Sequence, residues 1–191
     1  MLDADELARA AAFVRPEDHA VYIRAHAVVR RLLGGYLDVH PGRVRLVREP
    51  CPGCGDGHGR PAVAGSPLHY SLSRSGRVML VGVASSPVGV DIEEIPAADT
   101  AETVLAALHP RERSELRAVA PVARPAAFAR CWARKEAYLK GMGTGLAEHP
   151  SRTYVGAAPF PARLPRWTLT DVRVPGGYRA ACAVQSAVGA E

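Results

Sequence analysis

The sequence predicts an α+β fold made of two similar lobes, one over residues 1–86 and the other over residues 87–191. Two observations favour this fold. Each half begins with helical patterns and continues with paired strand patterns, and the halves meet near Ser86. The chain has 191 residues, 48% of them hydrophobic, which suits one packed domain or two small halves that share a core.

The first lobe is expected to begin with a helix over residues 3–35. Apolar and basic residues there have helical spacing, and Gly34-Gly35 is a plausible stop. A short strand is expected at residues 44–47. The following segment, residues 49–67, is rich in Gly, Pro and Cys and is therefore predicted to be a loop.

Three strands are expected close together, at residues 69–73, 77–84 and 88–92. Gly76 and the segment Ser85-Ser86-Pro87 supply the turns between them. Because short connections join antiparallel neighbours, the three strands are predicted to form an antiparallel meander.

The second lobe is expected to hold three helices, at residues 100–108, 110–119 and 125–141. Pro110 separates the first two, since proline breaks a helix but fits its first position. Two strands at residues 167–174 and 178–184 follow, joined by a Pro-Gly-Gly turn.

The net charge of +5 suits an anionic partner, such as a phosphorylated ligand or an acidic protein. The arginines are spread along the chain with few aromatic residues near them, so no nucleic-acid partner is predicted. No run reaches the roughly 18–20 apolar residues of a membrane span, and the acidic start differs from a signal peptide. We therefore expect a cytoplasmic protein without a membrane partner.

Two carboxylates, Asp91 and Glu93, lie two residues apart at the end of an apolar run. Residues i and i+2 of a strand share a face, and Ile92 between them is expected to point into the core. Neighbouring carboxylates repel unless a cation or a basic group lies between them. Taken alone, the pair favours a simpler interpretation, in which the strand runs into an acidic turn with Glu94 as a third solvated charge.

A second charged group lies on the helix expected at residues 125–141. Trp132, Glu136 and Lys140 are successive i, i+4 neighbours, and Lys135 follows Trp132 by three residues. The row fits a surface Glu–Lys pair and a ligand site equally well. With the strand pair, Glu136 completes a set of three carboxylates that could hold a hard divalent cation such as Mg²⁺. Lysines beside that cation suggest a phosphorylated ligand.

The two motifs, Gly89-Val90-Asp91-Ile92-Glu93 and Trp132-x-x-Lys135-Glu136-x-x-x-Lys140, resemble those of the 4′-phosphopantetheinyl transferases. The resemblance is closest to the Sfp-type group, and the composition rich in Ala, Arg and Gly suggests an actinobacterial-like member. Further segments match in chain order: Gly59-Arg60-Pro61, Ser71 to Gly76, His109 to Glu112, Gly141 to Leu146 and Gly177 to Cys182.

This resemblance implies two lobes in a pseudo-twofold arrangement within a monomer, with the active site between them. The first lobe would bind the nucleotide of coenzyme A, and the second would carry the metal and the catalytic residues. The implied reaction transfers the 4′-phosphopantetheine arm of coenzyme A to a serine of an apo acyl or peptidyl carrier protein, and 3′,5′-ADP leaves. The carrier would serve fatty acid, polyketide or nonribosomal peptide synthesis.

The resemblance also assigns roles to residues of the second lobe. Asp91, Glu93 and Glu136 would hold Mg²⁺, with Mn²⁺ as a possible substitute. Glu136 would also be the base for the carrier serine, directly or through a water molecule, and Lys140 would contact the phosphates. Lys135 would either assist Lys140 or be a solvated helix lysine.

For the nucleotide end of coenzyme A, the resemblance implies Arg24, Arg60, Ser73 and Arg74. Arg60 stands where the family usually has Lys, and Arg74 where it has His. Both exchanges keep a group that can donate to phosphate, and Arg stays charged at every ordinary pH. Ser71 replaces an Asn and casts doubt only on a local turn.

Cys51-Pro52-Gly53-Cys54 followed by His58 carries a second hypothesis, a zinc-containing basic module that binds nucleic acid. A zinc site needs about four ligands, and the sequence lacks a second Cys/His pair at suitable spacing. A turn with two reduced thiols is therefore the favoured interpretation. Cys131 and Cys182 lie in apolar surroundings and are expected to be small buried residues.

Overall fold

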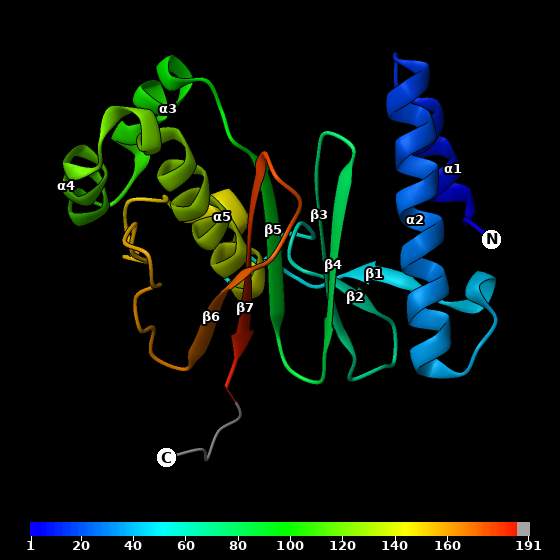
Figure 1. The fold of residues 1–191 in the computed structure, drawn as a ribbon. Coiled ribbons are helices and arrows are strands. Elements are labelled where there is room, and N and C mark those ends of the chain that lie inside the picture. The colour runs from blue at the N-terminus through cyan, green and yellow to red at the C-terminus, as the bar shows by residue number, and fades with distance from the viewer. Residues whose placement is uncertain (187–191) are drawn as a thin grey trace. The chain divides into compact units, whose positions relative to one another are not determined.

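The computed structural model describes residues 1–186 and has the expected α+β composition (Figure 1). The helices are α1 (Ala4–Ala11), α2 (Pro16–Leu37), α3 (Ala98–Val104), α4 (Pro110–Ala118) and α5 (Arg124–Met142). The strands are β1 (Leu46–Arg48), β2 (Pro61–Val63), β3 (His69–Ser75), β4 (Val78–Ala84), β5 (Val88–Glu94), β6 (Trp167–Val172) and β7 (Tyr178–Gln185). None of the helices in this described part has the length and apolar character that crossing a bilayer requires.

The chain forms two compact units. One consists of residues 1–47 and 63–65, and the other of residues 48–62 together with residue 66 onward. This division differs from the predicted boundary near Ser86. Compactness and internal similarity are different criteria, however, so the lobes at residues 1–86 and 87–191 stay a prediction.

The expected first helix is in fact two helices. α1 begins at a capping box formed by Asp3, and α2 restarts the helical path with Pro16 in its first turn. Gly34-Gly35 does not stop α2, which continues to Leu37. The helix ends at Asp38, which has a φ of 52° and donates its N–H to the Gly34 carbonyl. Aspartate tolerates this left-handed conformation better than most residues, so the helix can end there without a glycine.

The strands form two sheets, ordered β1-β2-β3-β4 and β5-β7-β6. The predicted meander is therefore only partly right. β3 and β4 pair antiparallel from His69↔Ala84 to Ser75↔Val78, but β5 pairs with β7 from the end of the chain. The short strand β2 lies inside the segment that was expected to be a loop.

Serine side chains of β3, rather than its backbone, contact β5. Three serines on one face of β3 accept hydrogen bonds from backbone N–H groups of β5, at 3.1, 3.3 and 3.0 Å. The pairs are Ser71–Val90, Ser73–Ile92 and Ser75–Glu94. Residues i, i+2 and i+4 of a strand point the same way, so β5 runs along the serine face of β3. Ser71 is thus a buried strand residue and not part of a turn.

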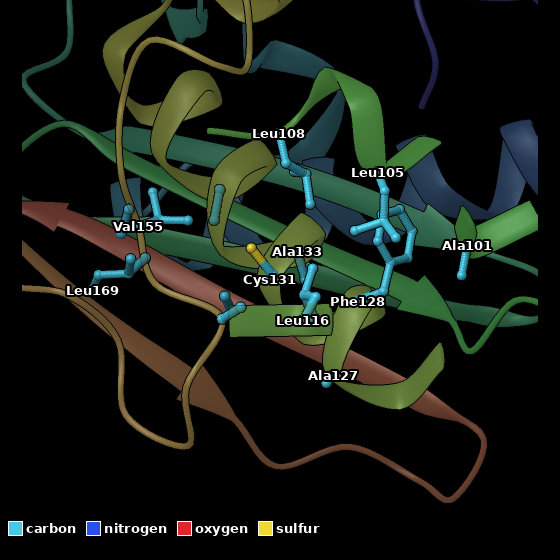
Figure 2. Packing of buried hydrophobic residues seen from close by; sticks show 14 of the residues in the cluster. Ala101, Leu105, Leu108, Leu116, Ala127, Phe128, Cys131, Ala133, Val155 and Leu169 are labelled. Atoms are coloured by element: carbon cyan, nitrogen blue, oxygen red, sulfur yellow. The ribbon is translucent and has the colours of Figure 1, made fainter. Parts of the chain in front are cut away.

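Helix α5 lies across β5 and β7 (Figure 1) and contributes to the main hydrophobic cluster. Figure 2 shows this packing, in which Cys131 and Ala133 of α5 lie among side chains of neighbouring elements. Cys131 is buried as expected, whereas Cys182 is only partly buried. Trp132 packs at the edge of the cluster and stacks on Phe128, with 6.0 Å between the ring centroids.

Two glycines let α5 and β5 approach closely. A Cβ atom on Gly89 would lie 2.0 Å from the Ala137 carbonyl oxygen of α5, and one on Gly141 would lie 3.2 Å from the Gly89 nitrogen of β5 and 2.6 Å from the Trp167 ring of β6. No side chain fits at these distances. Gly141 was expected to end the helix, but α5 ends at Met142 with Gly143 as its cap. The close contact sets the strand carboxylates beside the charged row of α5.

Candidate active site

Asp91 and Lys140 form the centre of the candidate site. The carboxylate of Asp91 is 2% exposed, and its Oδ1 lies 2.5 Å from Lys140 Nζ. Ser73 joins them: its hydroxyl donates to Asp91 Oδ1 at 2.7 Å and accepts from Lys140 Nζ at 3.1 Å. The second carboxylate oxygen of Asp91, Oδ2, is buried and has no hydrogen-bond partner. An orphaned buried carboxylate oxygen is a ligand position that a cation could fill.

Glu93 and Glu136 add two half-buried carboxylates to this centre. Burial and the negative charge of Asp91 raise the pKa of Glu93 from 4.5 to about 7, and Glu136 adds to this effect. Burial also raises the pKa of Glu136, although the nearby Lys140 ammonium opposes the shift. The pKa of Asp91 is raised by burial despite its ion pair with Lys140. One ammonium thus faces three acidic groups, and a divalent cation would balance their charge.

The three carboxylates interact electrostatically, but they do not form a closed ligand shell. Among residues 1–186, the group whose possible ligand atoms all lie within 4.8 Å of one another is Cys51, Cys54 and His58. Lys140 Nζ instead lies against Asp91, where it neutralises the buried charge. The assignment of Asp91, Glu93 and Glu136 to a metal therefore stays a prediction, supported by the donor chemistry and by the unpartnered Asp91 oxygen.

The structure places Lys135 away from this centre. Its ammonium is 1% exposed and forms an ion pair with the fully buried Glu112 of α4 at 2.8 Å. It also donates to the Thr153 carbonyl. The expected alternative of a solvated helix lysine is wrong, because the side chain is buried, and these internal contacts argue against a phosphate ligand. Glu112 lies 23 residues before Lys135, so local spacing gave no sign that the two form a pair.

Ser73 lies at the centre rather than in a nucleotide pocket. Its hydroxyl is engaged by Asp91, Lys140 and the Ile92 N–H. Arg74 is exposed, and because successive strand residues point to opposite faces, it does not share the face of Ser73. The two residues therefore do not line one pocket together as expected.

Arg60 lies beside the C-terminal end of α5. Its guanidinium donates to Glu49 at 2.7 and 2.9 Å and to the Gly141 carbonyl at 2.9 Å. The contact between Glu49 and Arg60 was not predicted, because a spacing of eleven residues between an acid and a base gives no signal in the sequence. Arg24 is exposed on α2 in the other unit. Nucleotide binding by Arg24, Arg60 and Arg74 stays a prediction.

Comparison with known proteins decides the family. Residues 87–178 match the 4′-phosphopantetheinyl transferase superfamily. The 4′-phosphopantetheinyl transferase HetI of Nostoc sp. (strain PCC 7120) is 33% identical over 180 residues, which cover 90% of this chain and 73% of HetI. The chain belongs to the 4′-phosphopantetheinyl transferase superfamily. It is thus an enzyme of the transferase type, and the predicted family is confirmed.

Two other phosphopantetheinyl transferases cover less of the chain. Psf-1 of Bacillus pumilus is 34% identical over 134 residues, which are 69% of this chain and 53% of psf-1. AcpT of Salmonella typhi is 40% identical over 108 residues, which are 53% of this chain and 56% of AcpT. The chain thus spans about half the length of these two relatives. The actinobacterial-like subgroup stays a prediction.

Proposed function

We propose that this transferase moves the 4′-phosphopantetheine arm of coenzyme A to a serine of an apo acyl or peptidyl carrier protein and releases 3′,5′-ADP. The observation that carries the proposal is the group of Asp91, Glu93 and Glu136 around Lys140. Acidic oxygen donors suit a hard cation, and a lysine beside them suits the pyrophosphate of coenzyme A.

Mg²⁺, or Mn²⁺ in its place, would be held by Asp91, Glu93 and Glu136. When bound, it would draw charge from the pyrophosphate and so make phosphorus easier to attack. Lys140 is a third exposed, so its ammonium can reach a ligand as well as Asp91. Released from Asp91, it would stabilise the negative charge that develops on the leaving oxygen.

Glu136 would be the base for the carrier serine. Its pKa is raised by burial, which makes its carboxylate a stronger proton acceptor than an exposed glutamate. Its place on α5, one turn before Lys140, puts the proton acceptor and the phosphate-binding ammonium on the same side of the helix. The serine oxygen would lose its proton to Glu136 while it attacks phosphorus.

Several finer features belong to the same proposal. Arg24, Arg60 and Arg74 would bind the nucleotide end of coenzyme A. The enzyme would be a cytoplasmic monomer without nucleic-acid or membrane partners, and its carrier would serve fatty acid, polyketide or nonribosomal peptide synthesis. Family membership favours this function over a basic nucleic-acid-binding module.

The test is the intact mass of an apo carrier protein after incubation with the enzyme, coenzyme A and Mg²⁺. The carrier should gain one phosphopantetheine arm, and EDTA should prevent the gain. Asp91→Asn and Glu136→Gln should each lower the rate at least about 100-fold, because each removes a charged group from the reacting centre. Glu94→Gln is the matched control, since Glu94 lies on the same strand outside the group and should be dispensable.

Two results would contradict the proposal. One is a variant of Asp91 or Glu136 that remains folded and retains most of the wild-type rate. The other is a complete lack of modification for acyl and peptidyl carriers alike, together with no binding of coenzyme A.

A further inference from the structure

The segment between Glu49 and Arg60 is a closed loop within one compact unit. The Glu49 N–H donates to the Arg60 carbonyl at 2.9 Å, and Arg48 donates to the Gly59 carbonyl at 2.9 Å. A Cβ atom on Gly59 would lie only 2.4 Å from the Glu49 carbonyl oxygen. The two ends of the loop therefore touch, and the proposed transfer reaction uses none of the cysteine and histidine side chains inside it.

Three of those side chains converge. The thiols of Cys51 and Cys54 and a ring nitrogen of His58 all lie within 4.8 Å of one another. Cys54 Sγ is 3.0 Å from His58 Nε2. Cys51 is buried, whereas Cys54 and His58 are exposed. Two thiols and an imidazole are ligands that zinc prefers, and their spread is small enough for one ion to contact all three.

The backbone around Cys51 is folded as a tight turn. The Gly55 N–H donates to the Cys51 carbonyl at 2.8 Å, and the Cys51 N–H donates to the Asp56 carbonyl at 2.7 Å. Gly55 has a φ of 81°, which glycine adopts without strain. The N–H groups of Gly53 and Cys54 hydrogen-bond to the Cys51 sulfur. The turn therefore holds this sulfur in a fixed place beside Cys54 and His58.

We propose that Cys51, Cys54 and His58 bind one zinc ion that clips this loop shut. Binding displaces one proton from each thiol, and the neutral imidazole donates its free nitrogen, so the ion gains two thiolates and one nitrogen while two protons are released. The fourth tetrahedral position is open to water or to Asp56, whose carboxylate lies beside the Cys54 thiol. No change in oxidation state is involved.

The clip would act on the neighbouring active-site region through Arg60. Arg60 follows His58 by two residues, and its guanidinium contacts Glu49 and the end of α5. Cross-linking Cys51 to His58 limits the motions of the segment between Glu49 and Arg60. The zinc ion would therefore have a structural role, distinct from that of Mg²⁺.

The test measures metal content and does not need transferase activity. Protein purified under reducing conditions without chelator should contain one zinc ion per chain. The metal-free protein should bind Co²⁺ with the charge-transfer and intense visible bands of a tetrahedral thiolate site. Cys54→Ser and His58→Ala should weaken zinc binding by at least about 100-fold, because each removes a ligand. Both residues are exposed, so these variants should still fold.

Cys182→Ser is the matched control, since it makes the same chemical change outside the loop and should keep full zinc content. Three results would overturn the inference: no zinc in the wild type with no thiolate bands from Co²⁺, undiminished zinc affinity in Cys54→Ser, or equal loss in Cys182→Ser. Failure of the carrier assay would leave these measurements untouched, and their failure would leave the carrier assay untouched.

Discussion

Lys140 sets the charge balance of the candidate site. Its ammonium pairs with Asp91, yet Glu93 and Glu136 remain near it with raised pKa values. A protein pays in stability for like charges held together, so the metal-free site opposes folding at a pH where all three acids are ionised. The same repulsion favours a bound cation.

Glu93→Gln should therefore stabilise the metal-free protein at pH 8. The folded protein holds the Glu93 proton up to about pH 7, whereas the unfolded chain releases it near 4.5. Stability thus falls as the pH rises through this window and stays lower above it. The variant should melt about 2–4 °C higher at pH 8, a modest value because Glu93 is partly open to solvent.

Thermal melting at pH 4 and pH 8, with EDTA or with Mg²⁺, checks this prediction. At pH 4 the variant and the wild type should melt alike, and Mg²⁺ should raise the melting temperature of the wild type more than that of the variant. If the variant melts at a lower temperature than the wild type at pH 8 without metal, repulsion between Glu93 and the neighbouring carboxylates does not destabilise the folded protein.

Lys135 should matter for stability rather than for coenzyme A. Lys135→Met leaves the carboxylate of Glu112 buried without its cation, which should cost about 3–5 kcal/mol in urea unfolding. The double variant with Glu112→Gln should recover part of this loss. The KM for coenzyme A should stay near the wild-type value in the folded protein. A large rise in that KM with unchanged stability would return Lys135 to the ligand site.

At the scale of elements, the contact between β3 and β5 links sheet assembly to the site. Ser73→Ala removes the hydroxyl that joins Asp91 to Lys140, and Ser75→Ala removes only the outermost strand contact. Loss of a hydrogen bond to a charged group costs about 1.5–3 kcal/mol. We therefore expect Ser73→Ala to lower kcat about tenfold or more and Ser75→Ala to have little effect. Equal losses, measured by carrier modification, would mean that the serines only hold the strands together.

The sequence predicted the positions of the long helices and strands, but it did not predict which strands pair with one another. The helical spacing and the strand patterns predicted α5, β3, β4, β6 and β7 within a few residues. The pairing of β5 with β7 joins segments about ninety residues apart, and side-chain hydrogen bonds from β3 accompany it on the other side of β5. Local periodicity reveals neither the pairing of distant strands nor the side-chain hydrogen bonds between them. The serines at every second position from Ser71 to Ser75 were the available signal for the contact between β3 and β5, because Asp91 and Glu93 have the same spacing of two residues.

Helix geometry explains why Glu136 lies at the candidate site whereas Lys135 lies away from it. Consecutive residues of a helix project about 100° apart, so Glu136 faces β5 while Lys135 faces α4. The motif in the sequence identifies both residues, but it does not show which element each side chain faces. Spacing of i, i+4 kept Glu136 and Lys140 together, and the strand period kept Asp91 and Glu93 together.

At the scale of the whole molecule, the net charge of +5 should steer an acidic carrier toward the enzyme. The KM for the carrier should therefore rise about tenfold between about 0.05 and 0.5 M salt, more steeply than the KM for coenzyme A. Initial rates at several salt concentrations, with one substrate held saturating, measure the KM for the carrier and the KM for coenzyme A separately. Equal salt dependence for both substrates would argue against a basic docking surface for the carrier.

The serine contacts of β5 have a consequence for solubility. A strand that pairs on one side only usually exposes a row of N–H donors, which can recruit a strand from another molecule. β5 pairs with β7 on one side, and on the other side its donors at Val90, Ile92 and Glu94 are taken by hydroxyl groups. The strand that carries Asp91 and Glu93 is thereby protected from intermolecular β-sheet growth at those three positions.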